Sequence, residues 1–106
     1  MRLLLPLALI IALPLAASAG VVNTPTCSAD LKRASGFISS VAARDRAGLP
    51  KDTAKRCEIW RLNAKEMFDA ATILDRCLTG HERTENVAHL RVSVGEVGAL
   101  IAQRCR

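Results

Sequence analysis

The sequence is poor in aromatic residues and lacks the short motifs that mark common catalytic sites. Phe37, Trp60 and Phe68 are its only aromatic residues, and tyrosine is absent. Three scattered rings cannot build the stacking platform on which single-stranded nucleic acid binds. The chain also contains no Gly-x-Ser-x-Gly, no His-Glu-x-x-His and no phosphate-binding glycine loop. We therefore expect a protein that is not an enzyme and that has no nucleic-acid partner.

Long apolar runs are missing after residue 19. Before that point, Arg2 precedes a short apolar run over residues 3–13, and Ala-Ser-Ala at residues 17–19 forms a small-x-small site. This pattern is typical of a cleaved signal peptide. Pro6 and Pro14 interrupt a segment that is already too short to span a bilayer as a helix. We expect residues 1–19 to be removed, no transmembrane segment, and a periplasmic or secreted location.

The four cysteines all follow this signal, and they include no Cys-x-x-Cys pair. An even number of cysteines in an oxidising compartment predicts disulfides, here two of them. Without Cys-x-x-Cys, the chain lacks the arrangement that lowers a thiol pKa in thioredoxin-like redox sites. No Cys-x-x-Cys-His haem attachment site is present either, and we expect no cofactor.

Residues 20–26 are expected to form an extended lead-in, and residues 27–106 a single helical domain. Apolar residues then recur at alternating steps of three and four, the period of an amphipathic helix. The pattern predicts three helices, at about residues 28–46, 50–78 and 81–105. In the first helix the apolar face consists of Cys27, Leu31, Ala34, Ile38 and Val41. In the second it consists of Cys57, Trp60, Ala64, Met67, Ala71, Leu74 and Leu78, and Ile59, Phe68 and Ile73 widen it to one side. In the third it consists of Val87, Leu90, Val94, Val97 and Ile101.

Glycine and proline suggest where these helices end. Gly48 follows the first pattern at a position that favours a left-handed cap, and Pro50 suits the first turn of the next helix. Thr79 and Glu82 match a capping box for the third helix, although Gly80 could equally cap the second. Within the third predicted helix, residues 92–95 also alternate like a strand. Its two interior glycines, Gly95 and Gly98, would permit close approach to Trp60 or Phe68.

The spacing of the cysteines restricts their pairing. Cys57 and Cys77 are twenty residues apart on one predicted helix, or about 30 Å, whereas a disulfide needs Cα atoms within about 7 Å. This excludes Cys57–Cys77 and its complement, Cys27–Cys105. Cys27 and Cys57 would lie at opposite ends of a helical hairpin. Cys27–Cys77 and Cys57–Cys105 remain, and they predict an all-α, antiparallel three-helix bundle, or a helical hairpin plus a third helix.

Two groups of polar residues are candidate binding sites. His81, Glu85 and His89 recur every four residues and follow Cys77 at the same interval, so that they form a weak candidate metal site. The two histidines are about 12 Å apart along a helix, too far to bind one ion together. The second group is a basic stretch that could attract an anionic envelope polymer. It comprises Lys51, Lys55, Arg56, Arg61 and Lys65, with the expected ion pairs Asp52–Arg56, Glu58–Arg61 and Lys65–Asp69.

These observations favour a non-catalytic interaction protein of the cell envelope. Its partner would be another envelope protein or a second copy of itself, in a chaperone-like or inhibitor-like role. Such a protein should expose an apolar patch or form a homodimer. The alternative is a metal-binding or redox protein that uses His81, Glu85, His89 and Cys77.

Overall fold

Three long helices account for most of the residues that the computed structural model describes, which are residues 20–106. They are α2 (Pro25–Ala47), α3 (Thr53–Cys77) and α4 (Gly80–Arg104). The predicted boundaries are therefore confirmed to within three residues, and the third segment is a continuous helix through Gly95 and Gly98. The predicted signal peptide, residues 1–19, lies outside the described residues.

Side-chain and backbone caps explain where the helices begin and end. The Thr24 hydroxyl accepts a hydrogen bond from the Cys27 N–H at 3.1 Å, and Pro25 occupies the first turn of α2. Gly48 ends α2 with a φ of 83°, a conformation that glycine adopts without steric cost. Pro50 was expected inside the next helix, but it lies in the connecting loop. Helix α3 instead begins after Asp52, whose carboxylate accepts a hydrogen bond from the Ala54 N–H.

The extended lead-in pairs with the turn between α3 and α4. Val21 forms an isolated antiparallel bridge with Leu78, and the Thr79 N–H donates to the Gly20 carbonyl at 2.8 Å. Thr79 is the N-cap residue of α4, but its side chain makes no capping hydrogen bond. The predicted capping box is therefore wrong. The Glu82 side chain packs against Gly20 instead, so closely that an added Cβ at Gly20 would lie 2.6 Å from its Cγ.

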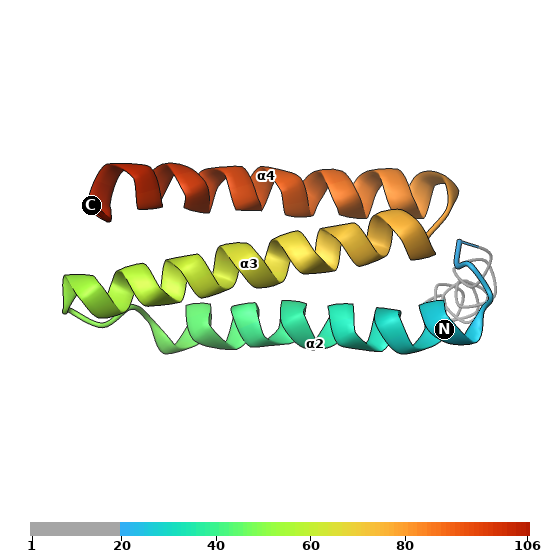
Figure 1. Ribbon diagram of the computed structural model, residues 1–106, viewed down its shortest axis with the longest axis horizontal. Coiled ribbons are helices and arrows are strands. Elements are labelled where there is room, and N and C mark those ends of the chain that lie inside the picture. Colours follow the sequence, from blue (N-terminus) through green and yellow to red (C-terminus); the bar gives the residue numbers. More distant parts are fainter. Residues whose placement is uncertain (1–19) are drawn as a thin grey trace, which may run out of the picture.

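The helices lie side by side in a single layer, with α3 in the middle (Figure 1). Helix α3 packs against both neighbours, whereas α2 and α4 have at most marginal contact with each other. The molecule measures 55 × 39 × 20 Å and has a radius of gyration of 17.4 Å. A compact domain of this length has a radius of gyration of about 12 Å. The predicted antiparallel three-helix bundle is confirmed, and it is an open, flat one.

The core lies toward the end of the layer that carries the Cys27–Cys77 disulfide. Ala34 of α2 and Ala70 of α3 are fully buried, and their small side chains allow these two helices to approach closely. Val87 and Leu90 of α4 complete the same cluster. Trp60 is buried as expected, but it lies outside this cluster. Phe68 is 60% exposed, so the prediction that it widens the core is wrong.

Candidate functional site

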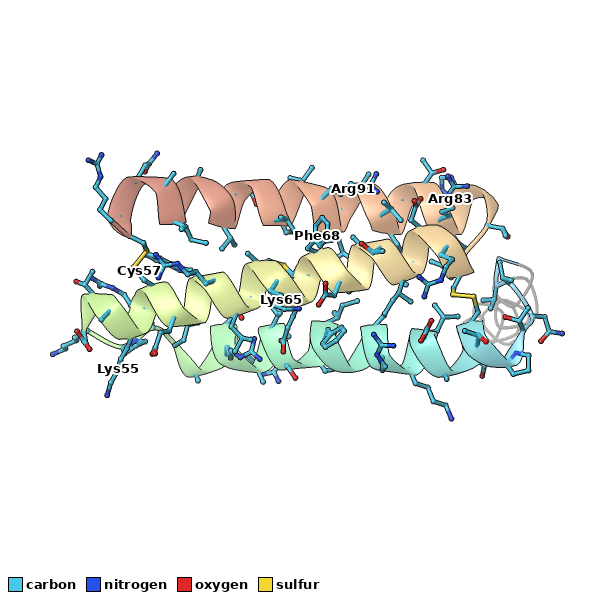
Figure 2. All side chains as sticks on the ribbon, viewed as in Figure 1. Lys55, Cys57, Lys65, Phe68, Arg83 and Arg91 are labelled. Carbon is cyan, nitrogen blue, oxygen red and sulfur yellow. A yellow bond between two sulfur atoms is a disulfide. The ribbon has the colours of Figure 1, made fainter. Side chains whose placement is uncertain are left out.

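Both predicted disulfides are present, one toward each end of the molecule. Cys27 and Cys77 join α2 to α3 with Cα atoms 5.3 Å apart, and Cys57 and Cys105 join α3 to α4 with Cα atoms 5.8 Å apart. Figure 2 shows Cys57 beside the C-terminal end of α4. All four cysteines are therefore bonded, and none carries a free thiol. Two disulfides in a chain of this size are typical of proteins that fold in an oxidising compartment.

The histidine stripe does not assemble into a ligand cluster. His81 Nε2 lies 3.2 Å from Glu85 Oε1, and both side chains are largely exposed on α4. His89 lies one turn further on, where it lines a groove facing α2. Cys77 is bonded to Cys27 and has no exposed surface. Within residues 20–106, no three potential ligands come together as a metal site.

A groove runs between α2 and α4, and α3 forms its floor. Its apolar lining comes from Ile38, Val41 and Ala42 of α2, Met67 of α3 and Leu90 of α4. The groove exists because α2 and α4 do not close over α3. Ile38 was expected in the core, yet it remains 40% exposed on the wall of this groove, which has a volume of about 220 Å³.

Polar groups border the apolar lining of the groove. Asp45 of α2 and His89 and Ser93 of α4 lie along it, so that hydrogen-bonding groups flank the apolar floor. Nearby, Arg44 holds α2 against α3. Its Nη1 donates to the Asn63 side-chain oxygen at 2.6 Å, and its Nη2 lies 2.8 Å from Glu66 Oε1. Arg44 thereby joins the C-terminal part of α2 to the middle of α3. This contact fixes the position of α2, which forms one wall of the groove.

The basic stretch is less neutralised than its sequence indicated. Of the three predicted ion pairs, only Lys65–Asp69 forms, at 2.7 Å. Arg56 donates instead to the Thr53 hydroxyl, and Asp52 accepts from the Ala54 N–H. The fold also brings Arg104 and Arg106 to this region, where they line one open hollow together with Lys55 and Arg61.

Sequence reasoning missed both the groove and the contribution of the two C-terminal arginines. Arg104 and Arg106 are about forty residues from Arg61 along the chain, and the Cys57–Cys105 disulfide brings them together. The predicted pairing of Cys57 with Cys105 was the signal that could have located them. The apolar pattern of α2 contained no comparable signal for the groove. It shows which face of α2 is apolar, but not how many helices pack against that face.

Comparison with protein-family models, with curated proteins and with solved structures finds no match to this chain. Among residues 20–106, no helix is long and apolar enough to cross a membrane.

Proposed function

We propose that this chain is a non-catalytic interaction protein of the periplasm or the extracellular space, and that it binds another protein through the groove between α2 and α4. The observation that carries the proposal is the open arrangement of the helices. Because α2 and α4 pack on α3 and scarcely on each other, Ile38, Met67 and Leu90 line a groove that nothing in residues 20–106 fills.

The size and lining of the groove favour a protein partner that inserts a few apolar side chains. Protein interfaces derive most of their binding energy from a few anchor residues that enter well-formed pockets. A volume of about 220 Å³ suits one or two such anchors. Asp45, His89 and Ser93 would provide the polar rim that surrounds the apolar centre of a typical interface.

The distribution of exposed apolar residues favours a different protein over a second copy of this one. Obligate homodimers bury large, continuous apolar surfaces. Here the large exposed apolar residues are spread over the lead-in, all three helices and a loop: Val21, Ile38, Leu49, Leu62, Phe68 and Val92.

Photo-crosslinking in the cells that naturally produce the protein tests the proposal. A photoreactive residue at Ile38 should give one discrete adduct with another protein, whereas the same residue at Val92, which is 62% exposed on α4, should not. An adduct of twice the mass of the protein would show self-association instead. Equal adducts from both positions, or none from Ile38, would contradict the proposed groove.

A further inference from the structure

The positive charge of the protein is concentrated at the end that carries the Cys57–Cys105 disulfide. We call this the basic end, and define it as residues 44–63 and 99–106. It contains eight basic side chains (Arg44, Arg46, Lys51, Lys55, Arg56, Arg61, Arg104 and Arg106) and three acidic ones (Asp45, Asp52 and Glu58). The rest of residues 20–106 contains six basic and seven acidic side chains. The net positive charge of the described chain therefore lies at one end of the layer (Figure 1).

Most cations of the basic end lack ion-pair partners within residues 20–106. Among the described residues, only Arg44 of these eight forms a salt bridge, with Glu66. Of the six cations elsewhere in residues 20–106, Lys32 alone forms no ion pair. Arg33 and Arg76 pair with Asp30, and Arg83 and Arg91 lie close to Asp75. The unpaired cations at the basic end remain available to an external anion.

Helix stability does not account for most of these cations. Arg46 and Arg104 lie in the last turns of α2 and α4, where a positive charge complements the helix dipole. Lys55 and Arg56 lie in the first turn of α3, where the dipole disfavours positive charge, and that turn contains no acidic residue. Side chains that lower helix stability are expected where they serve a function.

Exposed apolar side chains accompany the cations. Leu49 is 50% exposed in the loop between α2 and α3, and Arg46 and Lys51 lie close to it in the chain. Leu62 is 42% exposed and, with Pro50 and Ile59, lines a shallow apolar hollow that Lys55 and Arg61 border. Basic residues beside exposed apolar ones are typical of surfaces that bind anionic lipid bilayers.

The geometry points to an anionic phospholipid surface as the ligand of the basic end. The cations extend from the α2–α3 loop across α3 to the C-terminus of α4, and Figure 2 shows Lys55 projecting away from the helices. Lys55, Arg61, Arg104 and Arg106 line one hollow, but Arg46 and Lys51 lie outside it, so that the cations cover a wider surface than a single phosphate would contact. A soluble polyanion would use the cations but would gain little from Leu49, whereas a bilayer can accept Leu49 at the boundary between its headgroups and acyl chains.

Co-sedimentation with lipid vesicles tests this inference with a matched pair of charge reversals. The exported, disulfide-bonded protein should bind vesicles that contain phosphatidylglycerol, and not pure phosphatidylcholine, at about 0.1 M salt, where the Debye length is about 10 Å. Lys55→Glu should weaken binding by about 10-fold or more, because each cation near an anionic leaflet contributes to the attraction. Lys32→Glu is the control, since Lys32 forms no ion pair within the described residues but lies on α2 outside the basic end. Both variants should retain the two disulfides and the helical circular dichroism of the parent protein.

Leu49→Ser distinguishes the bilayer from other anionic ligands. It leaves every charge in place, and it should weaken vesicle binding several-fold while leaving any binding to inorganic polyphosphate unchanged. Binding to polyphosphate with no response of vesicle binding to Leu49→Ser would assign the basic end to an anionic polymer and overturn the inference. Equal losses of vesicle binding from Lys55→Glu and Lys32→Glu would show that the net charge of the protein, and not the basic end, causes the attraction, and would overturn the inference. Absence of vesicle binding at this salt concentration would also overturn it.

Discussion

The two ends of this protein are built from the same three helices and one disulfide each, yet they differ in almost every other respect. At the end with Cys27–Cys77, the core packs tightly around Cys77, and Asp30 and Asp75 neutralise the arginines nearby. The lead-in adds backbone hydrogen bonds there. At the basic end, Cys105 is half-buried, most cations are unpaired and Leu49 is exposed.

This contrast shows how a small chain can distribute its packing and its charge unevenly. A domain of fewer than a hundred residues buries too little surface to form a large core along its whole length. Concentrating packing and ion pairs at one end leaves the other end free to keep unpaired charge and exposed apolar side chains. At the basic end, the bond between Cys57 and Cys105 acts together with a smaller set of buried residues, Cys57, Trp60 and Asn63.

The largest expected effect comes from removing each disulfide by a pair of Cys→Ala substitutions. The two bonds close loops of nearly equal length, with sequence separations of 50 and 48 residues. The chain-entropy model therefore assigns each about 4 kcal/mol. Any difference between the two variants in the free energy of unfolding must then come from the native state. We expect the larger loss when Cys27 and Cys77 are replaced, because this substitution leaves a cavity in the core. Urea denaturation measures both, and a larger loss at the basic end would reverse the comparison.

Truncating one leucine of α3 in the packed end and one in the basic end should separate the two regions. Leu74 is 8% exposed and belongs to the core, so that Leu74→Ala should cost about 3 kcal/mol of unfolding free energy. Leu62 is 42% exposed at the basic end, and Leu62→Ala should cost less than about 1 kcal/mol. Thermal and urea unfolding of the two variants provide the measurement. Similar losses would mean that both ends are packed alike.

Neutralising one acidic residue at each end should show which charges stabilise the fold. Asp30 contacts both Arg33 and Arg76, and Asp30→Asn should cost about 1 kcal/mol, less at high salt because exposed ion pairs are screened. Glu58 forms no ion pair among the described residues, and Glu58→Gln should leave the unfolding free energy nearly unchanged. A salt titration of both variants checks this, and a comparable loss for Glu58→Gln would indicate hidden pairing at the basic end.

The smallest expected effect is a gain in stability. Gly95 and Gly98 lie within α4, and a Cβ added at either position would meet nothing within 4 Å. Gly95→Ala and Gly98→Ala should each raise the unfolding free energy by about 0.5–1 kcal/mol, since alanine favours the helix. Gly48→Ala is the control and should destabilise the protein, because Gly48 has a φ of 83°. Destabilisation by Gly95→Ala or Gly98→Ala would show that these glycines pack against another molecule, such as a second copy of this chain.

Much of the fold follows from local rules that act along the chain. The alternating steps of three and four residues predicted each helix, because a helix must turn its apolar residues to one side. Helix length then restricted the disulfides, because residues such as Cys57 and Cys77 cannot meet on one rigid helix. The glycine at position 48 was recognisable from its place after the last apolar residue of α2.

Features that depend on contacts between distant residues were predicted less well. The apolar pattern assigned Phe68 to the core, but neither neighbouring helix buries it, and it remains 60% exposed. The expected partners of Arg56 and Arg61 were inferred from helical spacing, yet neither pair forms. At the start of α4, Glu82 packs against Gly20 of the lead-in and does not complete the capping box. For Phe68 and Glu82, a tertiary contact or its absence outweighed the local preference, whereas Asp52 and Arg56 form other local hydrogen bonds in place of their predicted ion pair.

The sequence by itself determined the helices, their antiparallel order and the two disulfides, because periodicity and chain length restrict these directly. Only the tertiary structure decided that α2 and α4 stay apart, that Ile38 and Met67 line an open groove, and that Arg104 joins the unpaired cations of the basic end. An apolar stripe requires that a helix be covered, but it does not specify by how many neighbours or at what angle. That choice comes from side-chain packing among all three helices at once, which no single segment encodes.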